Sequence, residues 1–185
     1  MSFGDQKDST MINILADPRI ERPLESMVAR QNMQKELEGK ITLVTQAMDQ
    51  LKESKETIES ISKQMKDKEG DEYKALKDLS KSTKSAIDSL MDIIVGPDNS
   101  KKQGIVGSKD RSISSYLFTA RRYLRSGTHN PGHTEERVVQ QVDVMIKPIL
   151  EGVNSFYETA WPDYRKEVEE IDLSPFKDYD PIKLN

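Results

Sequence analysis

Apolar residues recur at alternating intervals of four and three positions near the start of the chain. They form one register, which contains Leu37, Ile41, Val44, Met48, Leu51, Ile58 and Met65. Leu24, Met27 and Val28 extend this register towards the N-terminus, and Lys55 and Ser62 interrupt it. On an α-helix, such spacing places all members on one narrow face. The pattern therefore predicts a single helix of about 60 Å, which needs partner helices along its whole apolar face.

Three further registers follow, separated by glycine and proline. The second is closed by Gly96 and contains Tyr73, Leu76, Ser80, Thr83, Ile87, Leu90 and Ile94. The third ends at Gly127 and contains Ile113, Leu117, Ala120 and Leu124. The fourth contains Val138, Val142, Met145, Ile149, Val153, Phe156, Ala160, Tyr164 and Val168. Because serine and threonine hold central positions of the second register, we expect polar groups in that part of the core.

The fourth segment follows the turn at residues 130–132, where we expect Thr134 to act as the helix N-cap. Pro148 and Pro162 lie inside its register, and each is expected to kink the helix. Together the segments predict an all-α fold, an antiparallel four-helix bundle over residues 21–172 with a very long first helix. A polar loop is expected at residues 97–109 and an irregular tail at residues 173–185.

The first twenty residues precede the bundle and form a candidate extended arm. Residues 9–16 combine β-branched and apolar side chains, which is typical of a strand, and Asp17-Pro18 ends the run. A lone strand is not stable without a sheet. Residues 1–20 therefore form either an arm that lies on the bundle or the last strand of a β domain missing from this chain.

Composition narrows the class of protein. Charged residues make up 32% of the chain and apolar residues 35%, a balance typical of elongated helical proteins. The net charge of −4 argues against a dedicated nucleic-acid-binding protein, and the lack of cysteine excludes disulfides and thiolate metal sites. No apolar run is long enough to span a membrane, and the N-terminus lacks signal-peptide features. We expect either a cytoplasmic protein or a piece of a longer exported one.

No catalytic, cofactor-binding or metal-binding residue is predicted. The two histidines, His129 and His133, are separated by Pro131 and Gly132, so their spacing does not bring them to one helix face. Neither histidine follows a glutamate by three positions, as the di-iron bundles require. The glycine-containing run at residues 104–109 has serine and lysine in the wrong order for a phosphate loop. We therefore expect a protein without enzymatic activity.

Positive charge is concentrated in residues 99–129, which hold seven basic residues against Asp110 alone. The candidate interaction surface consists of Lys101, Lys102, Arg111, Arg121, Arg122 and Arg125. Residues 151–185 hold nine acidic and four basic side chains. The favoured interpretation is that these two regions neutralise each other within the chain. The alternative is that the basic region binds a polyanion.

The order of these signals resembles a known family. A strand-like run ends in Asp17-Pro18-Arg19, long helices follow, and the chain continues through the 131–134 turn to an aromatic segment at 156–164. In these respects residues 11–164 resemble the C-terminal helical segment of large bacterial sortilin-like, BNR-repeat β-propeller proteins, often labelled glycosyl hydrolases. The polar run at residues 96–102 departs from the more apolar linker expected there. The resemblance implies an exported multidomain parent whose propeller lies upstream.

The leading functional hypothesis is a non-enzymatic docking or assembly module at the C-terminus of such an exported propeller protein. Its expected partner is a protein, either its own upstream domains or another chain, and a homodimer is left open. In this case the location is periplasmic or extracellular. The alternative is a stand-alone cytoplasmic regulatory or polyanion-binding bundle that acts through the basic region at residues 99–129.

Overall fold

The chain folds into an elongated helical bundle. The structure, a computed structural model, describes residues 2–3, 5–15, 17, 23–96, 112–127, 129–171 and 173. Its helices are α1 (Leu24–Gln64), α2 (Asp71–Val95), α3 (Ile113–Ser126), α4 (His133–Glu158) and α5 (Ala160–Glu170). Two short strands, β1 (Ser2–Phe3) and β2 (Gln6–Lys7), pair antiparallel ahead of them. The prediction of an all-helical bundle is confirmed.

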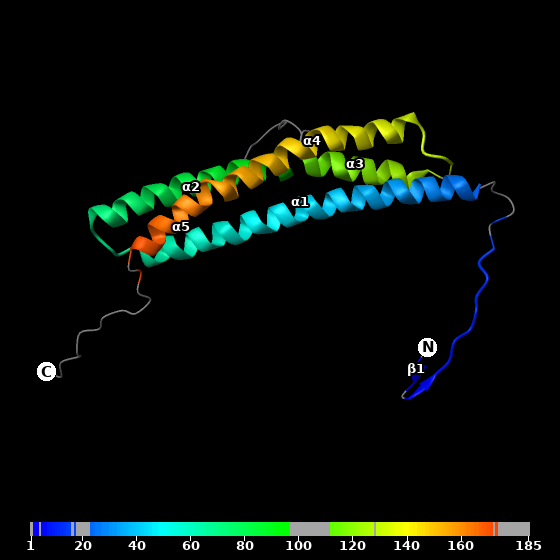
Figure 1. The fold of residues 1–185 in the computed structure, drawn as a ribbon, viewed down its shortest axis with the longest axis horizontal. Coiled ribbons are helices and arrows are strands. Elements are labelled where there is room, and N and C mark those ends of the chain that lie inside the picture. Colours follow the sequence, from blue (N-terminus) through cyan, green and yellow to red (C-terminus); the bar gives the residue numbers. More distant parts are fainter. Residues whose placement is uncertain are drawn as a thin grey trace, which may run out of the picture.

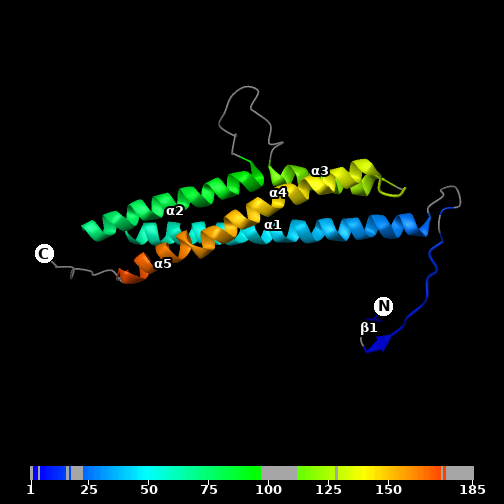
Figure 2. The same cartoon turned by 45° about the horizontal axis from the view of Figure 1, so that its top comes forward.

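α1 runs along the whole bundle, and the other helices lie against it (Figure 1). α2 covers one half of α1, and α3 continues in the same direction along the other half (Figures 1 and 2). α4 and α5 return alongside both, so that α4 contacts α1, α2 and α3. The turn into α2 uses Gly70, whose φ of 139° favours glycine. The two halves of α1 thus pack against different helices, α2 and α3.

The buried residues follow the predicted registers closely on α1, α2 and α3. On α4, Val139 and Ile146 are buried where Val138 and Met145 were predicted, and the latter two are only partly buried. Along α1 and its C-cap residue Met65, the members at intervals of seven are buried, namely Leu37, Val44, Leu51, Ile58 and Met65. On α2 the predicted polar core positions, Ser80 and Thr83, are also buried. The hydroxyl of Ser80 lies 3.1 Å from the Tyr164 hydroxyl on α5, so the two polar groups satisfy each other inside the core. The expectation of polar groups in this part of the core is confirmed.

Two boundaries of the fourth segment differ in detail from prediction. α4 begins at His133 with Gly132 as N-cap rather than Thr134, and the Glu135 carboxylate accepts a hydrogen bond from the Gly132 amide at 3.1 Å. The predicted single helix is interrupted at Thr159, between α4 and α5. Pro162 explains the break, because its ring would clash with the carbonyl of Glu158 in a continuous helix.

α4 continues through the other proline of this segment. Pro148 lies inside α4 on its exposed side. There, water can satisfy the carbonyl that the missing proline N–H leaves without a donor. The two prolines therefore differ in effect, because one falls in the first turn of a new helix and the other within an established one.

The predicted strand at residues 9–16 is wrong for the described part of that run. Residues 9–15 form no strand, whereas the two short strands lie earlier, at positions that the sequence analysis did not single out. Between 80% and 96% of the surface is exposed at Met11, Ile12, Ile14 and Leu15. These residues therefore do not lie on the bundle. Whether they belong to a missing β domain stays a prediction.

Gly39 offers a test of helix propensity in α1. It lies in the middle of the helix, is exposed, and has no atom within 4 Å of the position a Cβ would take. Gly39→Ala should raise the free energy of unfolding by up to about 1 kcal/mol, because alanine loses less backbone entropy in a helix than glycine. Urea denaturation followed by circular dichroism measures the change. A decrease in stability would show that α1 bends or opens at this position.

Candidate functional site

The described part of the predicted basic surface lies on the outer face of α3. Arg121, Arg122 and Arg125 are exposed there, together with Phe118, of which 68% is exposed. Their spacing of i, i+3, i+4 and i+7 makes them one continuous row, which we call the α3 outer row. The row lines a shallow hollow of about 380 Å³. The other predicted members, at positions 101, 102 and 111, lie outside the described residues.

Burial of the opposite face of α3 explains why this row faces outwards. Ile113, Leu117, Ala120 and Leu124 are all buried, as their register predicted. The side chain of Ser112 caps the N-terminus of α3 by accepting a hydrogen bond from the Ser115 amide at 3.3 Å. The helix is therefore held in one rotation about its axis, and the row is a fixed feature of the surface.

The arginines of the α3 outer row have no acidic partner within the described part of the chain. α3 itself contains no aspartate or glutamate. Several cations on the other helices do have acidic partners: Lys55 lies 2.6 Å from Asp88, and Lys84 lies 2.6 Å from Glu59. This face is therefore locally positive, because three exposed arginines share a helix that has no acidic residue of its own.

The favoured interpretation of internal neutralisation is wrong for α3 and residues 151–171, the described parts of the two regions, and it stays a prediction for the other residues of both. α5 and the end of α4 lie at the opposite end of the bundle from α3 (Figures 1 and 2). In the described segments, no ion pair joins residues 151–171 to α3; Arg165 and Lys166 instead have their acidic partners within α5. The opposite net charges of the two regions were counted correctly from the sequence. In a bundle of such long helices, however, two regions of opposite charge can lie too far apart to form ion pairs.

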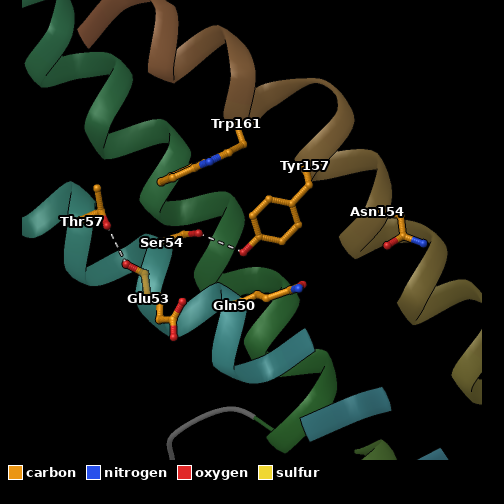
Figure 3. A pocket seen from close by; sticks show the side chains of 7 residues that line it. All are labelled: Gln50, Glu53, Ser54, Thr57, Asn154, Tyr157 and Trp161. Carbon is orange, nitrogen blue, oxygen red and sulfur yellow. Dashed lines mark hydrogen bonds between the residues drawn. The ribbon is translucent and has the colours of Figure 1, made fainter. Parts of the chain in front are cut away.

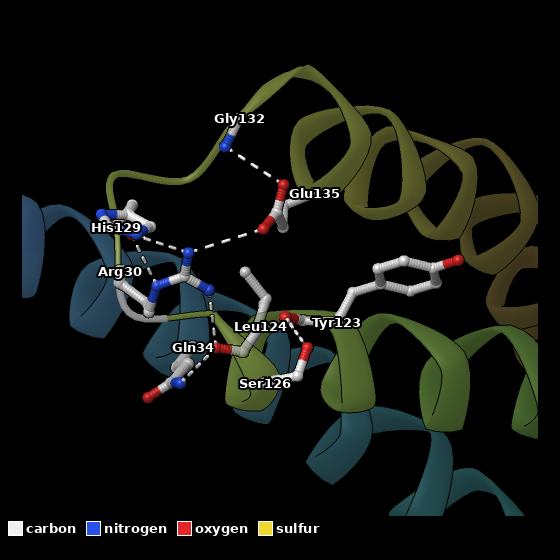
Figure 4. A network of polar contacts seen from close by, with 8 residues as sticks. All are labelled: Arg30, Gln34, Tyr123, Leu124, Ser126, His129, Gly132 and Glu135. Carbon is white, nitrogen blue, oxygen red and sulfur yellow. Dashed lines mark hydrogen bonds and ion pairs between the residues drawn. The ribbon is translucent and has the colours of Figure 1, made fainter.

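A buried arginine, Arg30 on α1, holds the end of α3 in place (Figure 4). Its guanidinium donates hydrogen bonds to the carbonyl of Leu124 at 2.9 Å and to the carbonyl of His129 at 2.7 Å and 3.0 Å. It also lies 3.5 Å from the Glu135 carboxylate. The Leu124 carbonyl is among the last four of α3, which have no partner within the helix, and Gln34 donates to it as well at 3.0 Å.

Arg30 was not among the functional residues predicted from the sequence, although its position carries a signal. Arg30 stands seven positions before Leu37, on the extension of the α1 register, where it is only 8% exposed. A charged residue at such a position needs a buried partner. Gly127 belongs to the same arrangement, because a Cβ there would collide with the guanidinium of Arg30. The close approach explains why glycine ends α3.

Glu135 completes this network electrostatically. Hydrogen bonds from its own backbone amide and from that of Gly132, together with the charge of Arg30, lower the pKa of its carboxyl, although burial opposes the shift. The ionised form is therefore stabilised in the folded protein. Arg30 and Glu135 together fix the turn between α3 and α4, and hence the C-terminal end of the α3 outer row.

A second basic area lies between α1 and α2. It is lined by Ile58, Glu59, Ser62, Lys63, Lys77, Ser80, Lys81 and Lys84. Two of its lysines already have partners, since Lys84 pairs with Glu59 and Lys77 donates to the carbonyl of Lys68. This area contains no aromatic side chain. It is therefore a weaker docking candidate than the α3 outer row.

A groove between α1 and the α4–α5 pair is the other candidate site (Figure 3). It measures about 510 Å³ and is lined by Gln50, Glu53, Ser54, Thr57, Asn154, Tyr157 and Trp161. The Tyr157 hydroxyl lies 2.9 Å from the buried hydroxyl of Ser54. The groove was not predicted from the sequence, where the aromatic segment at residues 156–164 appeared only in the fourth apolar register and in the family resemblance. Its meeting with α1 depends on the tertiary structure.

The described residues contain no group of three or more histidine, aspartate or glutamate side chains placed to hold a metal ion. His129 is exposed in the turn before α4, and His133 is the exposed first residue of that helix. In the same described segments, no helix is both long and apolar enough to cross a membrane.

Comparisons with known proteins give no relative. No family model, no curated protein and no solved structure matches the chain. The resemblance to sortilin-like, BNR-repeat propeller proteins therefore rests on the sequence signals alone. The surfaces themselves have to support any proposal of function.

Proposed function

We propose that this protein is a non-enzymatic helical docking module and that the α3 outer row binds an acidic segment of a partner protein. The observation that carries the proposal is the row itself: three exposed arginines without an acidic partner in the described chain, beside an exposed phenylalanine. Arginine and aromatic side chains are the residues most enriched at the centres of protein interfaces. Guanidinium groups also bind carboxylates through two parallel hydrogen bonds.

The size and surroundings of the row favour a short acidic peptide over a nucleic acid. Residues 118–125 span about 10 Å of helix, which suits a few residues of an extended peptide. The protein as a whole carries a net charge of −4, so a long polyanion would be repelled by the surfaces around the row. Phe118 offers an apolar contact at the N-terminal end of the row. Polyanion binding remains the alternative function.

The wider proposal concerns the architecture and the setting of the module. We take the helices as an antiparallel four-helix bundle whose long first helix is a rigid support for the docking face. The module would belong to the C-terminus of a larger exported propeller-type protein, in the periplasm or outside the cell. The sequence resemblance supports this setting. Reading the gene upstream of Met1 tests it: a β-rich coding region with a signal peptide supports the proposal, and a stop codon contradicts it.

The docking proposal is tested by removing the charge of the row. In the variant Arg121→Ala/Arg122→Ala/Arg125→Ala, binding of a fluorescein-labelled glutamate- and leucine-rich peptide should weaken by roughly 10-fold or more, because the charge-assisted contacts are lost. Fluorescence anisotropy at low and at physiological salt measures the affinity, which should fall with salt.

A matched control removes the same charge elsewhere. Lys74, Lys147 and Lys166 are exposed on α2, α4 and α5, and their joint replacement by alanine changes the net charge equally. This control should bind the peptide nearly as well as the unmodified protein. An equal loss of peptide affinity in both variants would show that binding depends on the overall charge of the protein, and it would contradict a docking site on α3. Tighter binding of a single-stranded oligonucleotide than of the peptide would favour the polyanion alternative.

A further inference from the structure

Two aromatic rings form a fixed corner in the groove between α1 and the α4–α5 pair. The rings of Tyr157 and Trp161 have centroids 6.2 Å apart and an interplanar angle of 72°. Figure 3 shows the Tyr157 ring nearly face-on and the Trp161 ring nearly edge-on, so that they form two walls of the groove. Aromatic side chains that line a groove can hold a weakly hydrated cation over a ring face, within about 6 Å of the ring centroid.

Neighbouring contacts hold these rings in position. Phe156 packs edge-on against Tyr157 at 5.2 Å, and Tyr164 lies 5.8 Å from Trp161 between ring centroids. The hydrogen bond between Tyr157 and Ser54 fixes the hydroxyl end of the tyrosine. A ligand entering the groove therefore meets walls that are already ordered, which lowers the entropy cost of binding.

Charge in the groove has one sign. Glu53 is the only charged residue among those that line it, and no side chain in the described chain forms an ion pair with Glu53. The nearby Lys52 lies 3.8 Å from Asp49 instead. Burial raises the pKa of the Tyr157 hydroxyl, the hydrogen bond with Ser54 opposes this shift, and the negative charge of Glu53 adds to it. The groove thus combines two aromatic walls with one uncompensated negative charge.

We infer that this groove binds a quaternary ammonium group, with Tyr157 and Trp161 contacting its methyl surface and Glu53 compensating its charge. A quaternary ammonium is weakly hydrated, so it loses little on leaving water for an open groove, whereas a primary ammonium would keep its water. The amides of Gln50 and Asn154 and the hydroxyl of Thr57 line the groove and can contact polar groups on the rest of the ligand. The same chemistry is carried by a free choline-type compound or by a trimethylated lysine of a peptide.

The protein supplies its own reporter for this inference. Trp161 is the single tryptophan of the chain, so its fluorescence reports on the groove alone. Titration with choline should change the emission of Trp161 with a saturable curve. The neutral isostere of choline, in which carbon replaces the ammonium nitrogen, should produce no such curve. Equal responses to the two compounds, or no saturable response to choline, would overturn the inference.

Replacing single glutamates by glutamine tests whether Glu53 itself, rather than the overall negative charge of the protein, contributes to choline binding. Glu53→Gln should weaken choline binding by roughly 3-fold or more, since the compensating charge is lost at a partly exposed site. Glu56→Gln is the matched control, because Glu56 is exposed on the same helix and does not line the groove. Equal affinities in the two variants would overturn the role of Glu53.

A separate titration with peptides shows whether the ligand is a small molecule or part of a protein. Binding of a trimethyllysine peptide with at least the affinity of choline, and of the unmethylated peptide more weakly, supports the inference and points to a protein ligand. Binding of choline without the peptide supports it and points to a small molecule. Equal binding of the methylated and unmethylated peptides would contradict selection for a quaternary ammonium. Because these titrations do not involve the α3 outer row, their failure leaves the docking proposal intact.

Discussion

Replacing Leu51 by alanine is expected to lower the free energy of unfolding by about 2–5 kcal/mol. Leu51 lies on α1 with none of its surface exposed, inside the apolar core. The substitution removes the transfer energy of the lost carbon atoms and leaves a cavity that long, packed helices can close only in part. Urea denaturation followed by circular dichroism measures the loss, provided that the denaturant dependence stays unchanged.

Two comparisons make this result specific to the core. Ile149→Ala on α4 removes a comparable buried side chain and should cost a similar amount. Arg121→Ala or Arg122→Ala should each cost well under half as much, because exposed charges contribute little to stability. Equal losses at Leu51 and at the two arginines would show that the core has been assigned to the wrong faces.

The second large effect is expected at Arg30. Arg30→Met keeps the length of the side chain but removes the guanidinium, so the carbonyls of Leu124 and His129 lose a donor and Glu135 loses its cation. We expect a loss of about 2–4 kcal/mol, because the partners of a buried charge are left without hydrogen bonds. The same denaturation experiment measures it. Arg137→Met, at an exposed arginine of α4, is the control, and an equally small loss in both variants would contradict the role of Arg30.

The stabilising contact between Arg30 and Glu135 should also depend on pH. The pKa of Glu135 is lowered in the folded state, so its contribution is present above the pKa of the unfolded chain and is lost as the pH falls through the folded value. The stability difference between the unmodified protein and Arg30→Met should therefore narrow between about pH 7 and about pH 3. A difference that is constant over this range would assign the effect of Arg30 to the two carbonyls alone.

Helix periodicity accounts for the part of the structure that could be predicted. The buried faces of α1, α2 and α3 match their registers, including the polar pair Ser80 and Thr83, because the register of a helix is a local property of its own sequence. The stops at Gly96 and Gly127 were likewise visible as glycines at the ends of apolar registers. The interruption of the last long segment near Pro162 followed from local sterics in the same way.

The candidate sites could be predicted only in part. The basic composition of α3 marked Arg121, Arg122 and Arg125, since a helix with three arginines and no acid stands out in the sequence. The sequence did not predict that these arginines have no acidic partner in the described chain. Composition counts charges, whereas pairing depends on which helix lies opposite. Here the acidic residues of α5 lie at the other end of the bundle from α3 (Figure 1).

The sequence by itself thus determined which segments are helical and which faces of α1, α2 and α3 are buried, because both depend on neighbours within a few positions. Tertiary structure alone decided what those faces meet. α2 and α3 share α1 between them, Arg30 reaches carbonyls more than ninety positions away, and Ser54 meets Tyr157 across two helices. Many arrangements of amphipathic helices bury the same apolar faces. The arrangement adopted depends on the close packing of particular side chains across the bundle, and periodicity does not contain that information.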